Sequence, residues 1–182
     1  MAMAYCGFCH QKLRHRTDNG GKQEKKVGCD ACENLMEDRA EMRISSIDRN
    51  DLELLLAWRS FPEIYEHFRK QDGPLSWEEH LNWFQSRDEN RYDFIIHYEG
   101  RRVGSISLNS EDEVGIFIGE HSAQGYGVAT SALRWLCDRF DDHTPLTANV
   151  SNENTQSMQL FSRCGFEKQA ENGDWVKLQY TT

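Results

Sequence analysis

The stretch HSAQGYGVATSALRWL, residues 121–136, has two glycines at the start of a segment whose later residues follow a helical pattern. Glycine costs about 1 kcal/mol relative to alanine inside a helix, so Gly125 and Gly127 indicate a special backbone requirement here. A residue without Cβ lets a ligand approach the main chain, and the free N–H groups of a helix's first turn favour an anion. The stretch therefore predicts a phosphate-binding turn; a tight strand-to-helix corner without a ligand is the alternative.

Two common phosphate loops do not fit this turn. The dinucleotide-binding pattern G-x-G-x-x-G needs a third glycine, which is absent here. The P-loop needs a Gly-Lys-Ser/Thr sequence, which does not follow. An anion site at this turn would therefore belong to another class, and the tight corner without a ligand stays open.

The chain from residue 42 onward alternates between strand and helix patterns. Strands are expected at 42–48, 92–98, 102–108, 113–120, 146–151 and 174–180, and helices from Asn50 or Asp51, after Pro62, from Ser76, at 127–140 and at 154–164. Ser76 and Glu79 have the spacing of a capping box. The order β-αα-β-β-β-α-β-α-β predicts an α/β domain with a mixed sheet.

A second motif, ENTQSMQLFSRCGF at residues 153–166, decides between the two interpretations of the glycine turn. Together the two motifs resemble those of the GNAT acetyltransferase superfamily, and the predicted element order resembles the order in that superfamily. The resemblance covers residues 42–180. The matching positions are Gln124, Gly127 and Ala129 in the first motif and Asn154, Ser157, Leu160, Phe161, Gly165 and Phe166 in the second. The resemblance implies a GNAT fold and acetyl-CoA as the cosubstrate.

The resemblance also implies how coenzyme A is held. Main-chain N–H groups of 124–129 would bind its pyrophosphate, and the strand at 114–118 would pair with the pantetheine amides. Asn154 would bind the pantetheine arm, and it can also act as the N-cap of its own helix. The expected cofactor-binding residues are Ile116, Phe117, Ile118, Gln124, Gly125, Tyr126, Gly127, Val128, Ala129, Asn154 and Phe161.

The catalytic groups of a direct transfer are less well defined by the sequence. Glu113 is the first candidate for the general base, followed by Glu120 and His97; solvated charges at strand ends, or a water chain, are the alternatives. Main-chain N–H groups around 117–119 would stabilise the thioester oxygen. Phe161 occupies the position of the family's usual tyrosine, so the donor of the leaving-group proton is unassigned.

The segment between residues 51 and 84 resembles the acceptor-side helices of two groups within the superfamily. These are bacterial nucleotide-sugar amine acetyltransferases, including those of pseudaminic acid biosynthesis, and ribosomal-protein alanine N-terminal acetyltransferases. The residues expected to line or support the acceptor pocket are Trp58, Arg59, Glu63, His67, Trp77 and Trp83, although the tryptophans could simply fill core. A small-molecule or sugar amine is the preferred acceptor and a protein N-terminus is second. A non-catalytic CoA-binding scaffold is the third interpretation.

Four of the six cysteines form two C-x-x-C pairs near the N-terminus, at Cys6, Cys9, Cys29 and Cys32. Two such pairs predict a closed four-thiolate zinc site, whose binding energy would fold this polar segment. Disulfides or a redox pair are the alternatives. The predicted domains are a zinc-ribbon-like module with its linker at 1–38 and an acetyltransferase domain at 39–182. The module could contact protein or nucleic acid, while Cys137 and Cys164 are expected to be buried small hydrophobes.

The composition restricts the remaining function classes. The 182 residues are 38% hydrophobic, which suffices for a packed core, and the net charge is −9. Residues 1–35 carry six basic and four acidic side chains, so they contribute +2 and the remainder −11. Such an acidic body argues against general nucleic-acid binding by the main domain. The absence of a long apolar run and of a signal-like N-terminus predicts a cytoplasmic protein without membrane contact.

Overall fold

The computed structural model describes residues 14–15, 27–29, 34–36, 42–143 and 145–181. The first three segments are the strands β1 (Arg14–His15), β2 (Val27–Cys29) and β3 (Asn34–Met36), which form a three-stranded antiparallel sheet in the order β1-β2-β3. The predicted zinc ligands Cys6, Cys9 and Cys32 lie outside the described residues, and so do most residues of the predicted module. No helix in the described segments is long and apolar enough to span a lipid bilayer.

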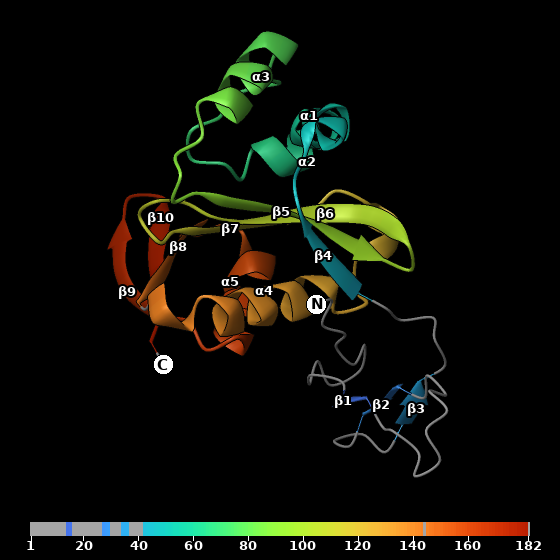
Figure 1. The fold of residues 1–182 in the computed structure, drawn as a ribbon. Helices are drawn as coiled ribbons and strands as arrows, with labels where there is room; N and C mark the ends of the chain where they lie inside the picture. The colour runs from blue at the N-terminus through green and yellow to red at the C-terminus, as the bar shows by residue number, and fades with distance from the viewer. Residues whose placement is uncertain (1–13, 16–26, 30–33, 37–41, 144, 182) are drawn as a thin grey trace.

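The main domain consists of two antiparallel sheets with helices on both faces (Figure 1). The first sheet has the order β4-β5-β6-β7 and the second the order β8-β10-β9. The strands are β4 (Met42–Ser46), β5 (Tyr92–Tyr98), β6 (Arg101–Leu108), β7 (Val114–Ile118), β8 (Leu146–Ser151), β9 (Glu167–Asn172) and β10 (Trp175–Tyr180). The helices are α1 (Leu52–Arg59), α2 (Pro62–Tyr65), α3 (Trp77–Gln85), α4 (Val128–Arg139) and α5 (Thr155–Arg163).

The prediction of a mixed sheet is wrong for the strand ladders, which are all antiparallel in the described part of the chain. The crossover β7–α4–β8 makes β7 and β8 parallel neighbours, as such a connection requires. Their pairing stops after one bridge, between Glu113 and Thr147, where Thr147 N donates to Asp112 O at 2.8 Å. The two sheets therefore meet at one point, beyond which the backbone edges of β7 and β8 do not pair.

The side chains of the first sheet alternate between two cores, as the two-residue period of a strand requires. On one face, Ile116 and Ile118 pack with the large core beneath α4 and α5. On the other face, Phe117 packs with a smaller core that contains Leu55 and Trp58 of α1. Figure 1 shows the corresponding layers, with α4 and α5 on one side of the sheet and α1–α3 on the other.

Local signals set the ends of several elements. Ser76 and Glu79 form the predicted capping box at the start of α3. Asp51 occupies the N-cap position of α1, as predicted, but its side chain makes no capping hydrogen bond; Asp48 caps the short 3₁₀ turn, Arg49–Asp51, that precedes α1. Gly165, which follows the C-cap Cys164 of α5, has φ +91°, the left-handed conformation in which many helices end.

The strand β9 was not predicted from the sequence. Its residues, EKQAEN, are all exposed, so they carry no alternation of apolar and polar side chains. The strand forms because a tight turn at Gly173, with φ +58°, pairs it with β10.

Candidate functional site

The unpaired edges of β7 and β8 open into a cavity of about 900 Å³. One side of the cavity comes from β7, the loop that follows it and the start of α4; the other comes from β8 and α5. The segment after α1, at 63–69, closes the third side. All eleven predicted cofactor-binding residues line this cavity, including the strand residues, the glycine turn, Asn154 and Phe161.

The backbone of β7 presents its unpaired groups to the cavity. Gly119 N donates to Val103 O at 2.9 Å, on the β6 side. In an antiparallel ladder, every second residue points its N–H and C=O groups toward the same neighbouring strand. Those groups of Phe117 therefore also face β6, and those of Ile116 and Ile118 face the gap. Among the main-chain groups expected around 117–119, only the N–H of Ile118 is therefore free to meet a ligand.

The glycine turn has the backbone that the sequence predicts. Gly125 has φ +81° and Gly127 has φ +75°, and both values fall in the left-handed region that favours glycine. Gly127 directly precedes α4, and its carbonyl accepts the hydrogen bond of Ser131 N at 3.0 Å. The N–H groups of Val128, Ala129 and Thr130 have no acceptor within the helix, so the first turn can bind an anion.

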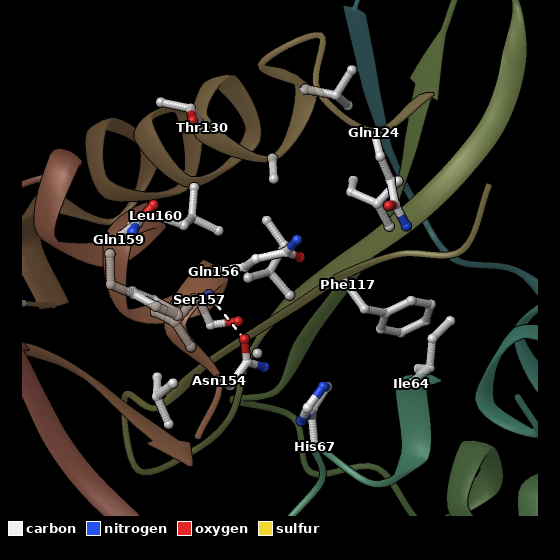
Figure 2. Close-up of a pocket in the computed structure, with 18 of the residues that line it drawn as sticks. Ile64, His67, Phe117, Gln124, Thr130, Asn154, Gln156, Ser157, Gln159 and Leu160 are labelled. Atoms are coloured by element: carbon white, nitrogen blue, oxygen red, sulfur yellow. Dashed lines mark hydrogen bonds between the residues drawn. The ribbon is translucent and has the colours of Figure 1, made fainter. Parts of the chain in front are cut away.

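Asn154 is the N-cap of α5, as predicted, and it also lines the cavity. Its Oδ1 accepts the N–H of Ser157 at 3.0 Å, which caps α5, and its side chain lines the cavity (Figure 2). The amide NH₂ group remains a donor for a ligand. The exposed face of α5 continues the wall through Gln156, Gln159 and Arg163, which the sequence analysis did not select although they share a helical spacing.

Phe161 lies at the inner wall of the cavity. It is 3% exposed, and its ring packs edge to face against Phe166 with centroids 4.9 Å apart. No hydroxyl group is available at this position. Phe161 can therefore provide an apolar contact but cannot donate a proton.

Of the three predicted bases, the structure brings only Glu113 to the cavity. Its Oε2 is 3.4 Å from Nη2 of Arg69. Glu120 lies outside the cavity wall and accepts a hydrogen bond from Trp58 Nε1 at 3.1 Å. His97 also lies outside it, shares a 2.9 Å hydrogen bond with Ser45 Oγ, and has its pKa lowered by burial and by Arg43.

The predicted acceptor residues divide into two groups. Glu63 and His67 line the cavity, whereas Trp58, Arg59, Trp77 and Trp83 do not. Trp58 is 2% exposed and packs against Phe117, but Trp77 is 42% exposed, so the core interpretation fails for Trp77. The wall between Glu63 and the start of β7 is completed by Ile64, Phe68 and Arg69, which were not predicted from the sequence.

The two cysteines of the main domain are buried, as predicted. Burial, and secondarily Cys164, raises the pKa of Cys137 to about 12, and burial raises the pKa of Cys164. Neither thiol therefore has thiolate character near neutral pH. The described residues contain no cluster of histidine, cysteine and carboxylate side chains that could hold a metal ion.

A family model for the acetyltransferase (GNAT) domain matches residues 41–167, which include the cavity and both motifs. The chain belongs to the GNAT acetyltransferase family. A relative, the uncharacterized protein MJ1062 of Methanocaldococcus jannaschii, is 38% identical over 159 residues, which cover 80% of this chain and 32% of that protein. The chain thus spans about a third of that relative.

Solved structures agree with this family and fold. A domain from Methanocaldococcus jannaschii is 33% identical, with a TM-score of 0.74, and the match covers 79% of this chain and 99% of that one. The aminoglycoside acetyltransferase AAC(6')-Ib in complex with coenzyme A has a TM-score of 0.65 at 14% identity, covering 78% of this chain and 95% of that one. The second similarity shows a shared fold.

Proposed function

We propose that this protein transfers the acetyl group of acetyl-CoA directly to the primary amine of a small molecule, with a nucleotide-linked amino sugar as the preferred acceptor. The observation that carries the proposal is the gap between β7 and β8, which is lined at one end by the first turn of α4. An extended ligand with two amides and a pyrophosphate matches this arrangement of unpaired strand edge and helix N-terminus.

The residues of the gap have distinct roles in this proposal. The glycine turn and the N–H groups of Val128–Thr130 bind the pyrophosphate, and the Ile116 backbone and the Asn154 amide bind the pantetheine arm. The Ile118 N–H donates to the thioester oxygen as negative charge develops there. Phe161 supports the coenzyme by contact, so the thiolate leaves without a proton from this position.

The acceptor class rests on the charge and aromatic character of the third wall. Arg69 lines the cavity with a side chain that is 41% exposed. Behind it, Arg59 Cζ lies 5.1 Å from the ring centre of Phe68 and 5.8 Å from that of Trp83. Arginine beside aromatic rings suits a phosphate-bearing, planar group, and the acceptor of AAC(6')-Ib is itself a small-molecule amine.

A panel of amines tests the acceptor class. The panel contains UDP-glucosamine, glucosamine, spermidine, kanamycin and a peptide that begins with alanine. We expect kcat/KM for UDP-glucosamine to exceed that for glucosamine at least tenfold, measured as release of the CoA thiol and by the mass of the product. Fastest turnover of the peptide would favour an N-terminal acetyltransferase instead, and no turnover of any amine would contradict the proposed activity.

We also propose that the N-terminal segment is a structural zinc module. The antiparallel sheet β1-β2-β3 supports this, because β2 ends at Cys29 and β1 lies between the two cysteine pairs. We expect about one zinc per chain, lost in Cys29→Ser while acetyl-CoA still stabilises the main domain. Zinc-free protein with four reactive N-terminal thiols, purified without chelator, would contradict the module.

A further inference from the structure

The segment Glu63–Arg69, which we call the strap, lies beside β7 and contacts residues at both ends of that strand. At one end, Glu63 Oε2 lies 3.9 Å from His121 Nε2, just after β7. At the other end, Arg69 pairs with Glu113, just before β7. The strap therefore runs antiparallel to β7 and bridges both ends of the strand that is proposed to hold the thioester.

Direct transfer requires a group that removes the ammonium proton of the acceptor. The cavity wall contains seven titratable side chains: Glu63, His67, Arg69, Glu113, His121, Tyr126 and Arg163. Both carboxylates face a basic partner, since Glu63 lies by His121 and Glu113 by Arg69. Arginine does not lose its proton in proteins.

His67 is free of the ion pairs that hold Glu63, Glu113 and His121. It is exposed, lines the cavity, and its ring makes no hydrogen bond to any of the residues that the structure describes. Its neighbour Phe68 packs against Phe117, with ring centres 5.9 Å apart, which holds His67 beside β7. Figure 2 shows the His67 ring directed into the cavity between Phe117 and Asn154.

We infer that His67 is a catalytic residue that accepts the proton of the acceptor amine, and that the Arg69–Glu113 pair positions the strap that carries it. This inference rests on the proposed acetyl transfer. The acceptor ammonium gives one proton to a ring nitrogen of His67, and the lone pair that is freed forms the new C–N bond. The C–S bond breaks, and the thiolate takes the electron pair and the second proton that the nitrogen loses as the amide forms. His67 then returns its proton to solvent.

The first test is kinetic and uses the full chain with the best amine of the panel. Loss of a general base typically costs about 10²–10⁴-fold, so we expect His67→Gln to lower kcat at least 100-fold with little change in KM. His67→Gly should regain turnover in proportion to added imidazole base. Glu66→Gln, an exposed neighbour on the strap outside the cavity wall, is the matched control and should keep wild-type kcat.

The second test does not depend on turnover. Diethyl pyrocarbonate should modify His67 in the free protein, and acetyl-CoA should protect it, as followed by peptide mass spectrometry. The inference is overturned by a His67→Gln variant with kcat within threefold of wild type, by the absence of imidazole rescue in a variant that still binds acetyl-CoA, or by modification unaffected by acetyl-CoA. Wild-type protein that acetylates no amine contradicts the proposed function itself and the inference with it.

Discussion

The proposed coenzyme wall and the proposed acceptor wall of the cavity are built from different kinds of chemical group. The coenzyme wall, formed by β7, the glycine turn and α5, offers mainly backbone groups, whose positions follow from strand alternation and from two left-handed glycines. The acceptor wall, formed by the strap, offers mainly side chains from a segment with a four-residue helix, α2. A backbone site needs only the right local conformation, whereas a side-chain site needs correct packing between distant segments.

The largest effect expected in the molecule is the loss of coenzyme binding in Gly127→Glu. The substitution puts a negative side chain on a left-handed residue at the helix N-terminus. Acetyl-CoA at a hundredfold excess over Kd should stabilise the wild-type fold by about 2.7 kcal/mol, and this gain should disappear in the variant.

Gly173→Glu is the matched control for that substitution. Gly173 is also left-handed, with φ +58°, but lies in the β9–β10 turn with open space where a Cβ would be. The control therefore shares the backbone strain and the added charge and should keep the coenzyme effect. If acetyl-CoA stabilised Gly127→Glu and the wild type equally in thermal unfolding, the glycine turn would not be part of the coenzyme wall.

The difference between a site made of backbone groups and a site made of side chains explains how much could be predicted from the sequence. Gly125, Gly127, Asn154 and the Ser76 cap are local signals, and all of them have the predicted local structure. Two features depend on contacts between segments far apart in the sequence. These are the separation of β7 from β8 after one bridge and the ion pair between Arg69 and Glu113. No local pattern encodes them, so the acceptor wall was predicted only in part.

The packing of α1 on the acceptor side should depend on Gly119, which follows β7 where the two walls join. A Cβ at this position would lie 2.2 Å from the Trp58 ring, which packs against the end of β7. Overpacking of a core typically costs about 1–3 kcal/mol, so Gly119→Ala should lower the free energy of unfolding by about 2 kcal/mol. Gly73→Ala, with no atom within 4 Å of the new Cβ, should cost far less in the same denaturant titration. Equal free energies of unfolding for the two variants would mean that Trp58 is not tightly packed against Gly119.

A smaller, pH-dependent effect is expected from His80, which lies on the acceptor side in α3. Its side chain is fully buried and stacks on Trp83 with ring centres 5.1 Å apart. Burial, and secondarily Arg59, lowers the pKa of His80 below its ordinary value. The unfolded chain therefore binds the proton more readily, so this contribution to stability is present above about pH 6.5 and is lost as the pH falls.

The variant His80→Phe keeps a stacked ring that cannot be protonated. Its free energy of unfolding, measured in urea from pH 7.5 to 5, should fall less steeply toward acid than that of the wild type. Parallel pH profiles for the two proteins would show that His80 does not contribute to the acid sensitivity of the acceptor side.

The smallest expected effect is the coupling between Arg69 and Glu113, which joins the strap to the start of β7. The pair is partly exposed, with side chains 41% and 23% accessible and charged atoms 3.4 Å apart. Exposed pairs typically contribute about 0.2–1 kcal/mol, so a double-mutant cycle of Arg69→Gln and Glu113→Gln should give a coupling energy in this range that decreases with added salt. The same cycle for Arg101 and Glu99, 3.9 Å apart in the β5–β6 turn and more exposed, should give a value near zero. If the first cycle also gives zero, this end of the strap is held by the packing of Phe68 against Phe117 and not by the Arg69–Glu113 pair.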